Sequence, residues 1–168
     1  MVDYLVYKSF IGYVLMAETS KGFCWVEMGN SKNVLLKEFQ KKFEGRKLQR
    51  VSETKNIHFK KLIDYLEGKV KWNKFSFDVE STDFKKKVWR YMQTIPEGEV
   101  QSYSQIAEAI GSPRAYRAVA SACATNPMPL VVPCHRVVPK SGGIGQFSSG
   151  IFRKNKLLQA EGLSFGIK

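Results

Sequence analysis

Residues 102–122, SYSQIAEAIGSPRAYRAVASA, contain two short helical patterns separated by a glycine, a serine and a proline. The pattern that begins at Ser102 has the form of a capping box, in which a serine and a glutamine three residues later satisfy backbone N–H groups at the helix start. Gly111 is placed to end this helix, and Ser112 followed by Pro113 is placed to begin the next. Two helices joined by a three-residue turn with glycine predict a helix-turn-helix motif.

The second of these helices has one face of small side chains and another that carries arginines. The positions expected to face inward are Ala115, Ala118, Val119 and Ala122. Arg114, Arg117 and Ser121 then lie on another face, from which arginines can reach DNA phosphates or enter the base stack. A generic pair of packed helices is the alternative interpretation, because helices joined by short turns are common.

The chain is strongly basic, with a formal net charge of +12. Residues 1–80 contain 15 basic and 10 acidic residues, and residues 81–168 contain 12 basic and 5 acidic residues, which gives +5 and +7. Few acids therefore offset the cations of the second half, as is typical of proteins that bind a polyanion. A lysine-rich surface that only keeps the protein soluble explains the charge equally well.

Length and composition favour a globular protein. A chain of 168 residues, 43% of them hydrophobic, suits one domain or two small ones with a core. No apolar run approaches the roughly 18 residues that a membrane-spanning helix needs, and the first residues do not resemble a signal peptide. We therefore expect a protein without membrane association in the cytoplasm, near the nucleoid, or in the nucleus of a eukaryote.

The three cysteines, Cys24, Cys123 and Cys134, are odd in number and show no Cys-x-x-Cys spacing, while His58 and His135 are the only histidines. This composition argues against a disulfide framework and against a zinc site. We expect reduced thiols, no metal and no cofactor.

Pro133-Cys134-His135-Arg136, flanked by apolar residues, is the candidate reactive segment. A cysteine becomes a strong nucleophile when a histidine or a nearby positive charge favours its thiolate form. Adjacent residues of an extended chain point to opposite faces, so a buried thiol beside a histidine that faces elsewhere is the alternative.

The first half of the chain predicts a small α+β unit without a constellation of reactive residues. Strands are expected over residues 4–8, 12–18 and 22–27 as an antiparallel meander, and over 74–79. Helices are expected after Asn30-Ser31 and over 56–67, with Ile57 inward and His58 as a surface or packing histidine. A further helix carries a stripe formed by Phe84, Val88, Trp89 and Met92.

From Gly98 onward the chain resembles the O6-alkylguanine-DNA alkyltransferase family. The matching segments follow the family's order and are Gly98-Glu99-Val100, Ser102-Tyr103, Arg117-Ala118-Val119, Asn126-Pro127, Pro129, Pro133-Cys134-His135-Arg136-Val137-Val138, Gly142-Gly143, Gly145, Leu157-Leu158 and Glu161-Gly162. The resemblance implies an α+β protein with two domains. Residues 1–80 would form a structural α/β domain of ribonuclease H-like fold, assigned by position, and residues 81–168 a mainly helical winged-helix or helix-turn-helix domain that binds DNA.

The resemblance also implies catalytic roles. Cys134 would accept the alkyl group, His135 would take the thiol proton through a water, and Glu161 would orient the imidazole. Tyr103 would assist rotation of the nucleotide and donate a hydrogen bond to guanine N3. Asn126 would tie the turn before the active site, although a purely local role in an Asn-Pro turn is the alternative.

DNA contacts and a base pocket follow from the same resemblance. Arg117 would fill the gap that a rotated nucleotide leaves in the base stack, and the other residues expected at DNA are Arg114, Ser121, Tyr103 and Arg136. The pocket residues would be Pro129, Val137, Val138, Phe147, Ser148 and Ser149. Phe147 replaces a frequent tyrosine, so a hydroxyl contact there would be lost while ring packing remains. Ser149 replaces a frequent glycine, and a side chain on that loop would narrow the pocket, which puts the tolerance of bulky alkyl groups in question.

The function expected from this resemblance is repair of O6-alkylguanine, chiefly O6-methylguanine, in double-stranded DNA by a monomer. It is that of a methylated-DNA–protein-cysteine methyltransferase, which transfers the alkyl group irreversibly to its own Cys134. A protein that binds alkylated DNA without reacting, or a helix-turn-helix regulator, is one alternative. A cysteine hydrolase that acts on acyl substrates is another.

Overall fold

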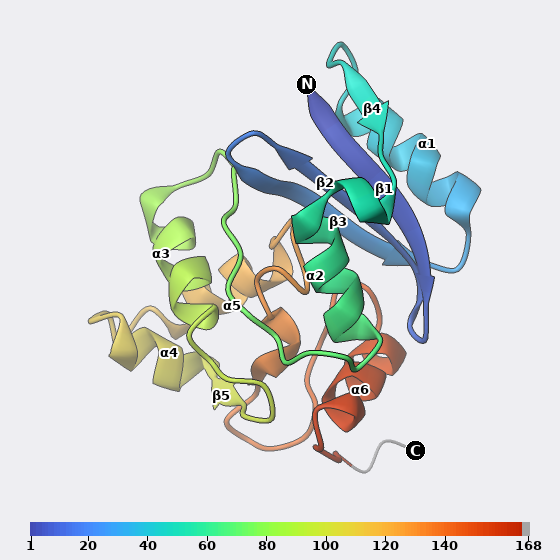
Figure 1. Ribbon diagram of the computed structural model, residues 1–168. Coiled ribbons are helices and arrows are strands. Elements are labelled where there is room, and N and C mark those ends of the chain that lie inside the picture. The colour runs from blue at the N-terminus through green and yellow to red at the C-terminus, as the bar shows by residue number, and fades with distance from the viewer. Residues whose placement is uncertain (166–168) are drawn as a thin grey trace. The chain divides into compact units, whose positions relative to one another are not determined.

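The computed structural model describes residues 1–165 and shows an α+β chain that divides into two compact units (Figure 1). Unit 1 comprises Met1–Val79, and unit 2 begins at Glu80. The predicted fold class is confirmed. Over the described residues, no helix has both the length and the apolar character needed to cross a bilayer.

Unit 1 is built on a four-stranded sheet with the strand order β3-β2-β1-β4. The predicted meander is confirmed by β1 (Val2–Ser9), β2 (Gly12–Thr19) and β3 (Gly22–Gly29), which pair antiparallel. The sequence did not predict β4 (Leu48–Arg50), which pairs parallel with β1. A strand of three residues is too short to show alternation, so only pairing with β1 reveals it.

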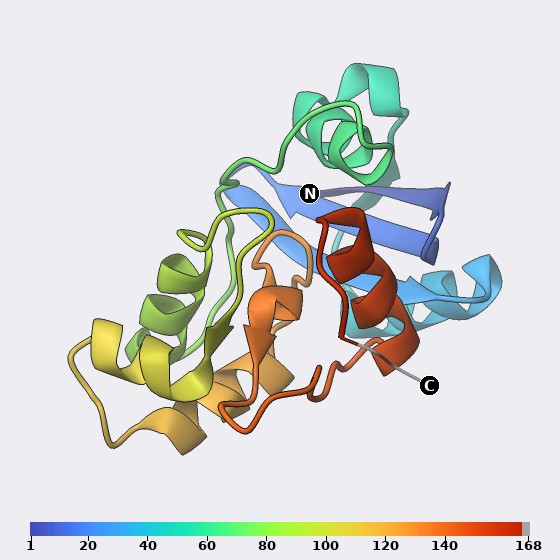
Figure 2. The ribbon, with the colours of Figure 1, turned by 90° about the horizontal axis from the view of Figure 1, so that it is seen from below.

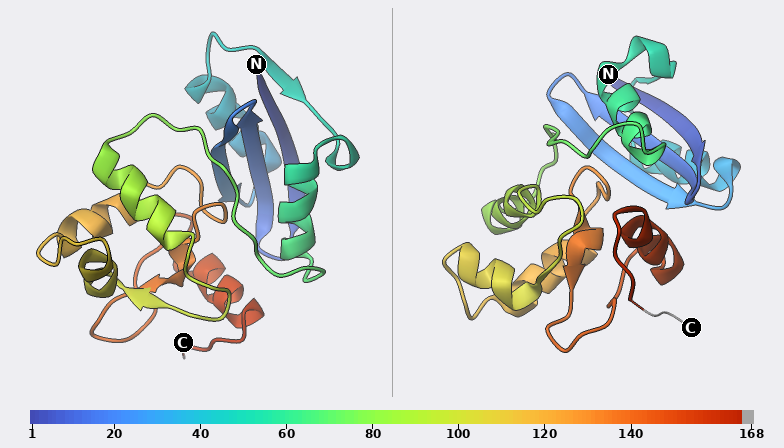
Figure 3. Two further views of the ribbon diagram at one scale, coloured as in Figure 1. Left: turned by 60° about the vertical axis from the view of Figure 1, so that its left-hand side comes forward. Right: turned by 60° about the horizontal axis from the view of Figure 1, so that its bottom comes forward.

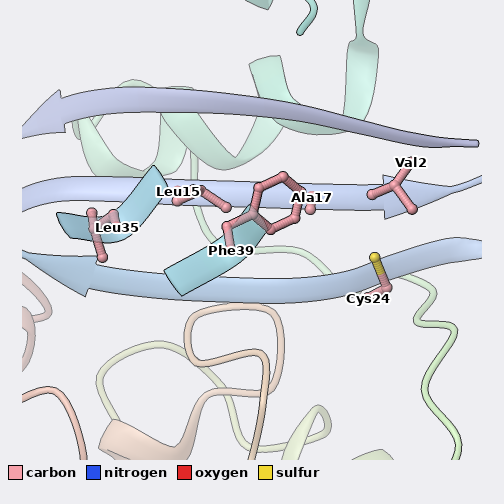
Figure 4. Packing of buried hydrophobic residues seen from close by; sticks show 6 residues of the cluster. All are labelled: Val2, Leu15, Ala17, Cys24, Leu35 and Phe39. Carbon is pink, nitrogen blue, oxygen red and sulfur yellow. The ribbon is translucent and has the colours of Figure 1, made fainter. Parts of the chain in front are cut away.

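Both faces of this sheet are covered by helices. α1 (Lys32–Lys42) packs on one face and α2 (Ile57–Leu66) on the other, with the short 3₁₀ turn η1 (Glu53–Lys55) before α2 (Figures 1 and 4). Successive residues of β2 are therefore buried, although they point to opposite faces. The α1 side of the core is formed by Val2, Leu15, Ala17, Cys24, Leu35 and Phe39 (Figure 4).

Two predictions for unit 1 require correction. Residues 74–79 form no regular strand, because their pairing with β3 is limited to one bridge between Phe77 and Phe23. Ile57, expected inward, is 65% exposed because it lies on the side of α2 opposite to the buried Phe59 and Leu66. His58 lies at the surface, as expected, and its Nδ1 is 2.9 Å from Oε2 of Glu18 on β2.

Unit 2 contains three helices that pack together, and two of them form the helix-turn-helix segment. These are α3 (Asp83–Met92), α4 (Tyr103–Ala109) and α5 (Tyr116–Ala124), which contact one another (Figure 3). The indole Nε1 of Trp89 on α3 donates to the backbone oxygen of Ala122 on α5 at 2.9 Å, which fixes the two helices in register.

The capping box at the start of α4 is confirmed, but α5 begins later than predicted. Ser112 does not cap it: the N-H of Ala115 bonds to the carbonyl of Ser112 at 2.9 Å, so Pro113 lies inside a turn rather than at the first helical position. Ala118, predicted inward, is exposed, because the inward face of α5 is centred on Val119, Ala122 and Cys123.

Two short parallel strands connect the helix-turn-helix to the cysteine segment. β5 (Gln101–Ser102) runs directly into α4 and pairs with β6 (Val137–Val138), which follows the 3₁₀ turn η2 (Cys134–Arg136) (Figure 2). The last element within residues 1–165 is α6 (Ile151–Ala160).

Candidate active site

Cys134 lies in the turn just before β6, and β6 is joined by strand pairing to the segment that leads into α4. Gln101 pairs with Val137 and Ser102 with Val138, and Tyr103 is the first residue of α4. Cys134 lies in a tight 3₁₀ turn, not on an extended segment, and its N–H bonds to the carbonyl of Val132 at 2.7 Å.

The Cys134 side chain lines a cavity of about 240 Å³. The residues that line this cavity are Tyr103, Ala120, Cys123, Ala124, Cys134, Gln146, Phe147 and Ser148. They come from the two helices of the helix-turn-helix, the cysteine turn and the loop before α6. The cavity therefore joins the candidate nucleophile to the candidate DNA-binding element.

His135 and Arg136 share one carboxylate, that of Glu161 at the end of α6. Nε2 of His135 lies 3.1 Å from Oε2 of Glu161, and Nη2 of Arg136 donates to the same oxygen at 2.8 Å. Nε of Arg136 donates to Oε1 at 3.0 Å, and the backbone N–H of Gly98 lies 3.4 Å from it. All three side chains are buried, so Glu161 is the hub of a buried network.

This network fixes the form of the His135 imidazole. Burial lowers the pKa of His135, and the hydrogen bond to Glu161 opposes that shift, so the ring is neutral at pH 7. With Nε2–H donating to Glu161, Nδ1 carries the free lone pair. Among residues 1–165, Nδ1 is the only buried side-chain nitrogen or oxygen without a hydrogen-bond partner. A neutral imidazole with an unused acceptor can take a proton.

Cys134 is held as a thiol with groups nearby that favour its ionisation. Burial raises its pKa to about 11, while a hydrogen bond from Asn126 and the positive charge of Lys154 act in the opposite direction. Asn126 also ties its own loop together: Nδ2 donates to the carbonyl of Val132 at 3.0 Å, and Oδ1 accepts from the N–H of Met128 at 2.9 Å.

Lys154 was not found by sequence reasoning. It lies on the buried face of α6 beside Leu157 and Leu158, and its Nζ donates to the carbonyls of Val137 at 2.7 Å and Gln146 at 3.0 Å. Burial lowers its pKa to about 8. The signal that could have found it is a lysine at an apolar position of a helical stripe.

Tyr103 faces the same cavity as a hydrogen-bond donor. Burial is the main cause that raises the pKa of its hydroxyl, and the charges of Cys123 and Cys134, when ionised, act in the same direction. The phenol is therefore protonated throughout the neutral range.

The predicted pocket residues are only partly brought together. Phe147 and Ser148 line the cavity, whereas the set that does not consists of Pro129, Val137, Val138 and Ser149. Val138 lines a separate open groove, and the backbone oxygen of Ser149 accepts from Arg153 at 2.9 Å. Cavity residues that the sequence did not predict are Ala120, Cys123, Ala124 and Gln146.

The predicted DNA contact of Arg136 is wrong. Its guanidinium is fully buried and is used by Glu161 and by the carbonyl of Ile95, which accepts from Nη1 at 2.8 Å. A group without access to solvent cannot reach a phosphate. Arg114, Arg117 and Ser121 are exposed, as a DNA-facing surface requires.

Comparison with known proteins matches both units. A model of the 6-O-methylguanine DNA methyltransferase DNA binding domain covers residues 83–163, and one of its ribonuclease-like domain covers residues 2–80. The methylated-DNA–protein-cysteine methyltransferase of Methanosarcina acetivorans is 36% identical over 170 residues, which cover 95% of this chain and 97% of that protein. This chain belongs to the methylated-DNA–protein-cysteine methyltransferase family.

Other members of this methyltransferase family extend the comparison. The crystal structure of the Mycobacterium tuberculosis O6-methylguanine methyltransferase has a TM-score of 0.77 at 31% identity, covering 96% of this chain and 93% of that one. The bifunctional transcriptional activator/DNA repair enzyme Ada of Escherichia coli is 36% identical over 160 residues, covering 95% of this chain but 45% of Ada. The chain spans 42% to 59% of the length of several curated members. The family resemblance is confirmed, including for the first half, which had been assigned by position.

Proposed function

We propose that this protein repairs double-stranded DNA by transferring the alkyl group of O6-alkylguanine, chiefly O6-methylguanine, to Cys134. The observation that carries the proposal is that Cys134 lines a cavity together with residues of both helices of the helix-turn-helix. His135, the next residue in the chain, is hydrogen-bonded to Glu161. Its relatives in Methanosarcina acetivorans and Mycobacterium tuberculosis are named for this chemistry, and the latter has also been solved in complex with DNA.

The transfer is a displacement at carbon. The sulfur of Cys134 forms a bond to the alkyl carbon as the bond between that carbon and O6 breaks, and the electron pair remains on the guanine. The thiol proton passes to Nδ1 of His135 through a water, and Glu161 stabilises the charged imidazole. Tyr103 donates a hydrogen bond to guanine N3, where negative charge builds.

Lys154 has a supporting role in this scheme. Its ammonium group lies close enough to the Cys134 sulfur to favour the thiolate, which burial alone disfavours. Asn126 acts from the other side through its hydrogen bond to the sulfur. Both groups stabilise charge that exists only after the thiol proton has left, which is the condition for lowering a barrier.

The buried position of Cys134 requires that the damaged nucleotide leave the duplex. A guanine within the base stack offers its O6 substituent to no side chain inside a protein cavity, so the nucleotide must rotate out. We assign Arg117 to the gap in the stack, and Arg114 and Ser121 to the phosphates, because these three side chains are exposed on and before α5. Acting on chromosomal DNA, the protein would work as a monomer in the cytoplasm or nucleus.

The product is a thioether, which has no carbonyl for water to attack. The protein is therefore consumed in one event, unlike a cysteine hydrolase, which releases an acyl group and repeats the cycle.

The decisive experiment uses a duplex that contains O6-methylguanine with a radiolabelled methyl group. We expect label on Cys134 at one methyl group per protein, and none on a Cys134→Ala variant. Cys24→Ala is the matched control, because this buried thiol belongs to unit 1 and should leave transfer unchanged. Methyl removal by Cys134→Ala, or many turnovers on a thioester by the wild type, contradicts the proposal.

A further inference from the structure

The start of α5 presents an exposed aromatic ring. Tyr116 is the first residue of this helix and is 44% exposed. Among the described residues of unit 2, the other exposed large apolar side chains are Ile151 and Phe152, both on α6. The helix-turn-helix therefore carries one exposed large apolar side chain, at the N-terminal end of α5, where the exposed arginines also lie.

Tyr116 stands between the two exposed arginines of this segment. Cζ of Arg117 lies 5.9 Å from the centroid of the Tyr116 ring, within the range of a cation–π contact. Arg114 is exposed two residues earlier. Within residues 1–165, neither arginine makes an ion pair, so both guanidinium groups are available to an external anion.

The surface around this ring permits close approach. Ala118 and Ser121, two and five residues further along α5, are also exposed and are too small to hold a DNA backbone away from the helix. Tyr116 is the one exposed large apolar side chain of α5, where the other exposed residues are small or basic. Proteins that bend or open a duplex use apolar side chains in this way, by inserting them between bases.

We propose that Tyr116 is a second wedge residue, whose ring packs against the exposed face of the base next to the gap that Arg117 fills. This inference rests on the proposed function, since it assumes that α5 faces DNA from which a nucleotide has rotated out. Removing one nucleotide leaves a neighbouring base without a stacking partner on one side. A tyrosine ring restores part of that stacking, and the adjacent guanidinium stays in register with it through their mutual contact.

The test measures binding to DNA that contains no alkyl group, so that it is independent of methyl transfer. Two fluorescein-labelled duplexes of one sequence are used, one intact and one with a single abasic site, and anisotropy gives the dissociation constant at several salt concentrations. The variants are Tyr116→Ala, Tyr116→Phe and Tyr116→Leu. The matched control is Phe152→Ala, which removes an exposed ring that also has a cation above it, Lys156 at 4.6 Å, but on α6.

We expect Tyr116→Ala to bind the abasic duplex about tenfold more weakly, with a smaller effect on the intact duplex, because stacking of one base is lost. The slope of log K against log salt stays unchanged, because no phosphate contact is removed. Tyr116→Phe keeps wild-type affinity, and Phe152→Ala does the same. Tyr116→Leu controls for a disturbance of the start of α5 by alanine, because leucine keeps an apolar side chain without an aromatic ring. It should lose a similar amount of affinity for the abasic duplex.

Four results would overturn the inference. The first three are wild-type affinity in both Tyr116→Ala and Tyr116→Leu, a reduced salt slope, and an equal loss in Tyr116→Phe, which would indicate a hydroxyl–phosphate hydrogen bond. An equal loss in Phe152→Ala would also overturn it, as a general effect of surface rings. Failure of the proposed function is read separately, as absence of methyl uptake by the wild-type protein.

Discussion

His135 and Glu161 lie 3.1 Å apart, Nε2 to Oε2, and Glu161 holds the buried guanidinium of Arg136 with the same carboxylate. One acid therefore has two tasks. It orients the imidazole, and it neutralises a buried cation that would otherwise be very costly to fold.

We predict that Glu161→Gln loses both tasks and that a second substitution separates them. Loss of the partner of a buried arginine should lower the free energy of unfolding by about 3 to 5 kcal/mol, measured by urea denaturation. Glu161→Gln combined with Arg136→Met should recover most of this stability, because no unpaired charge remains. Methyl transfer by the double variant should stay about 100-fold or more below wild type. Recovery of transfer together with stability would show that Glu161 has only a structural role.

Lys154 should make stability depend on pH. Its pKa is about 8 in the folded protein and 10.5 as the reference value for the unfolded chain, so folding favours the neutral amine. The stability that this preference contributes is present above pH 10.5 and is lost as pH falls to about 8. Relative to Lys154→Met, wild type should therefore gain as much as about 3 kcal/mol between pH 8 and 10.5.

Urea unfolding of both proteins at pH 7.5, 9 and 10.5 gives this difference directly. The comparison removes most of the opposite contribution of Cys134, whose raised pKa lowers stability between about pH 9 and 11 in both proteins. Lys140→Met, at an exposed position, is the control and should show no such trend. At pH 7.5, Lys154→Met should also transfer methyl groups more slowly than Lys140→Met. Parallel stability curves for wild type and Lys154→Met would contradict the prediction.

Two arginines should differ in the salt dependence of DNA binding. If exposed Arg114 contacts one phosphate, Arg114→Ala should weaken binding to any duplex and reduce the slope of log K against log salt by about 0.9. Arg136→Met, combined with Glu161→Gln to keep the interior neutral, should leave the slope unchanged because the guanidinium is buried. Equal slopes for Arg114→Ala and wild type would remove Arg114 from the DNA surface.

Gly22 is predicted to be essential for the packing of residues 75–79 on β3. Its φ is +143°, and a Cβ there would lie 2.7 Å from the carbonyl carbon and oxygen of Ser76. Gly22→Ala should therefore disrupt the two hydrogen bonds that join Phe23 to Ser76 and Asp78, and lower stability by about 2 to 4 kcal/mol. Gly45→Ala is the matched control: its φ is +82° but the space around it is open, so only about 1 to 2 kcal/mol of backbone strain is expected. Equal losses in the two variants, measured by thermal unfolding, would contradict the clash.

Local signals in the sequence determined most elements of the fold. The meander of unit 1, the stripe of α3 and the capping box of α4 depend on residues close in the chain, and the structure confirms them. The errors occur where local signals compete. Ser112-Pro113 fits both a helix start and a turn, and the turn forms because Ala115 bonds back to Ser112.

The sequence by itself also determined the family and the adjacency of a cysteine and a histidine along the chain, because both are carried by contiguous residues such as Pro133-Cys134-His135-Arg136. Only the tertiary structure decided which groups surround that thiol. Lys154 and Cys123 come to the region of the cavity from different helices. The guanidinium of Arg136 binds Glu161, which lies 25 residues later in the chain, instead of facing solvent. The burial of a charge and the choice of its partner depend on long-range packing. A local sequence pattern therefore cannot predict which carboxylate pairs with a buried arginine.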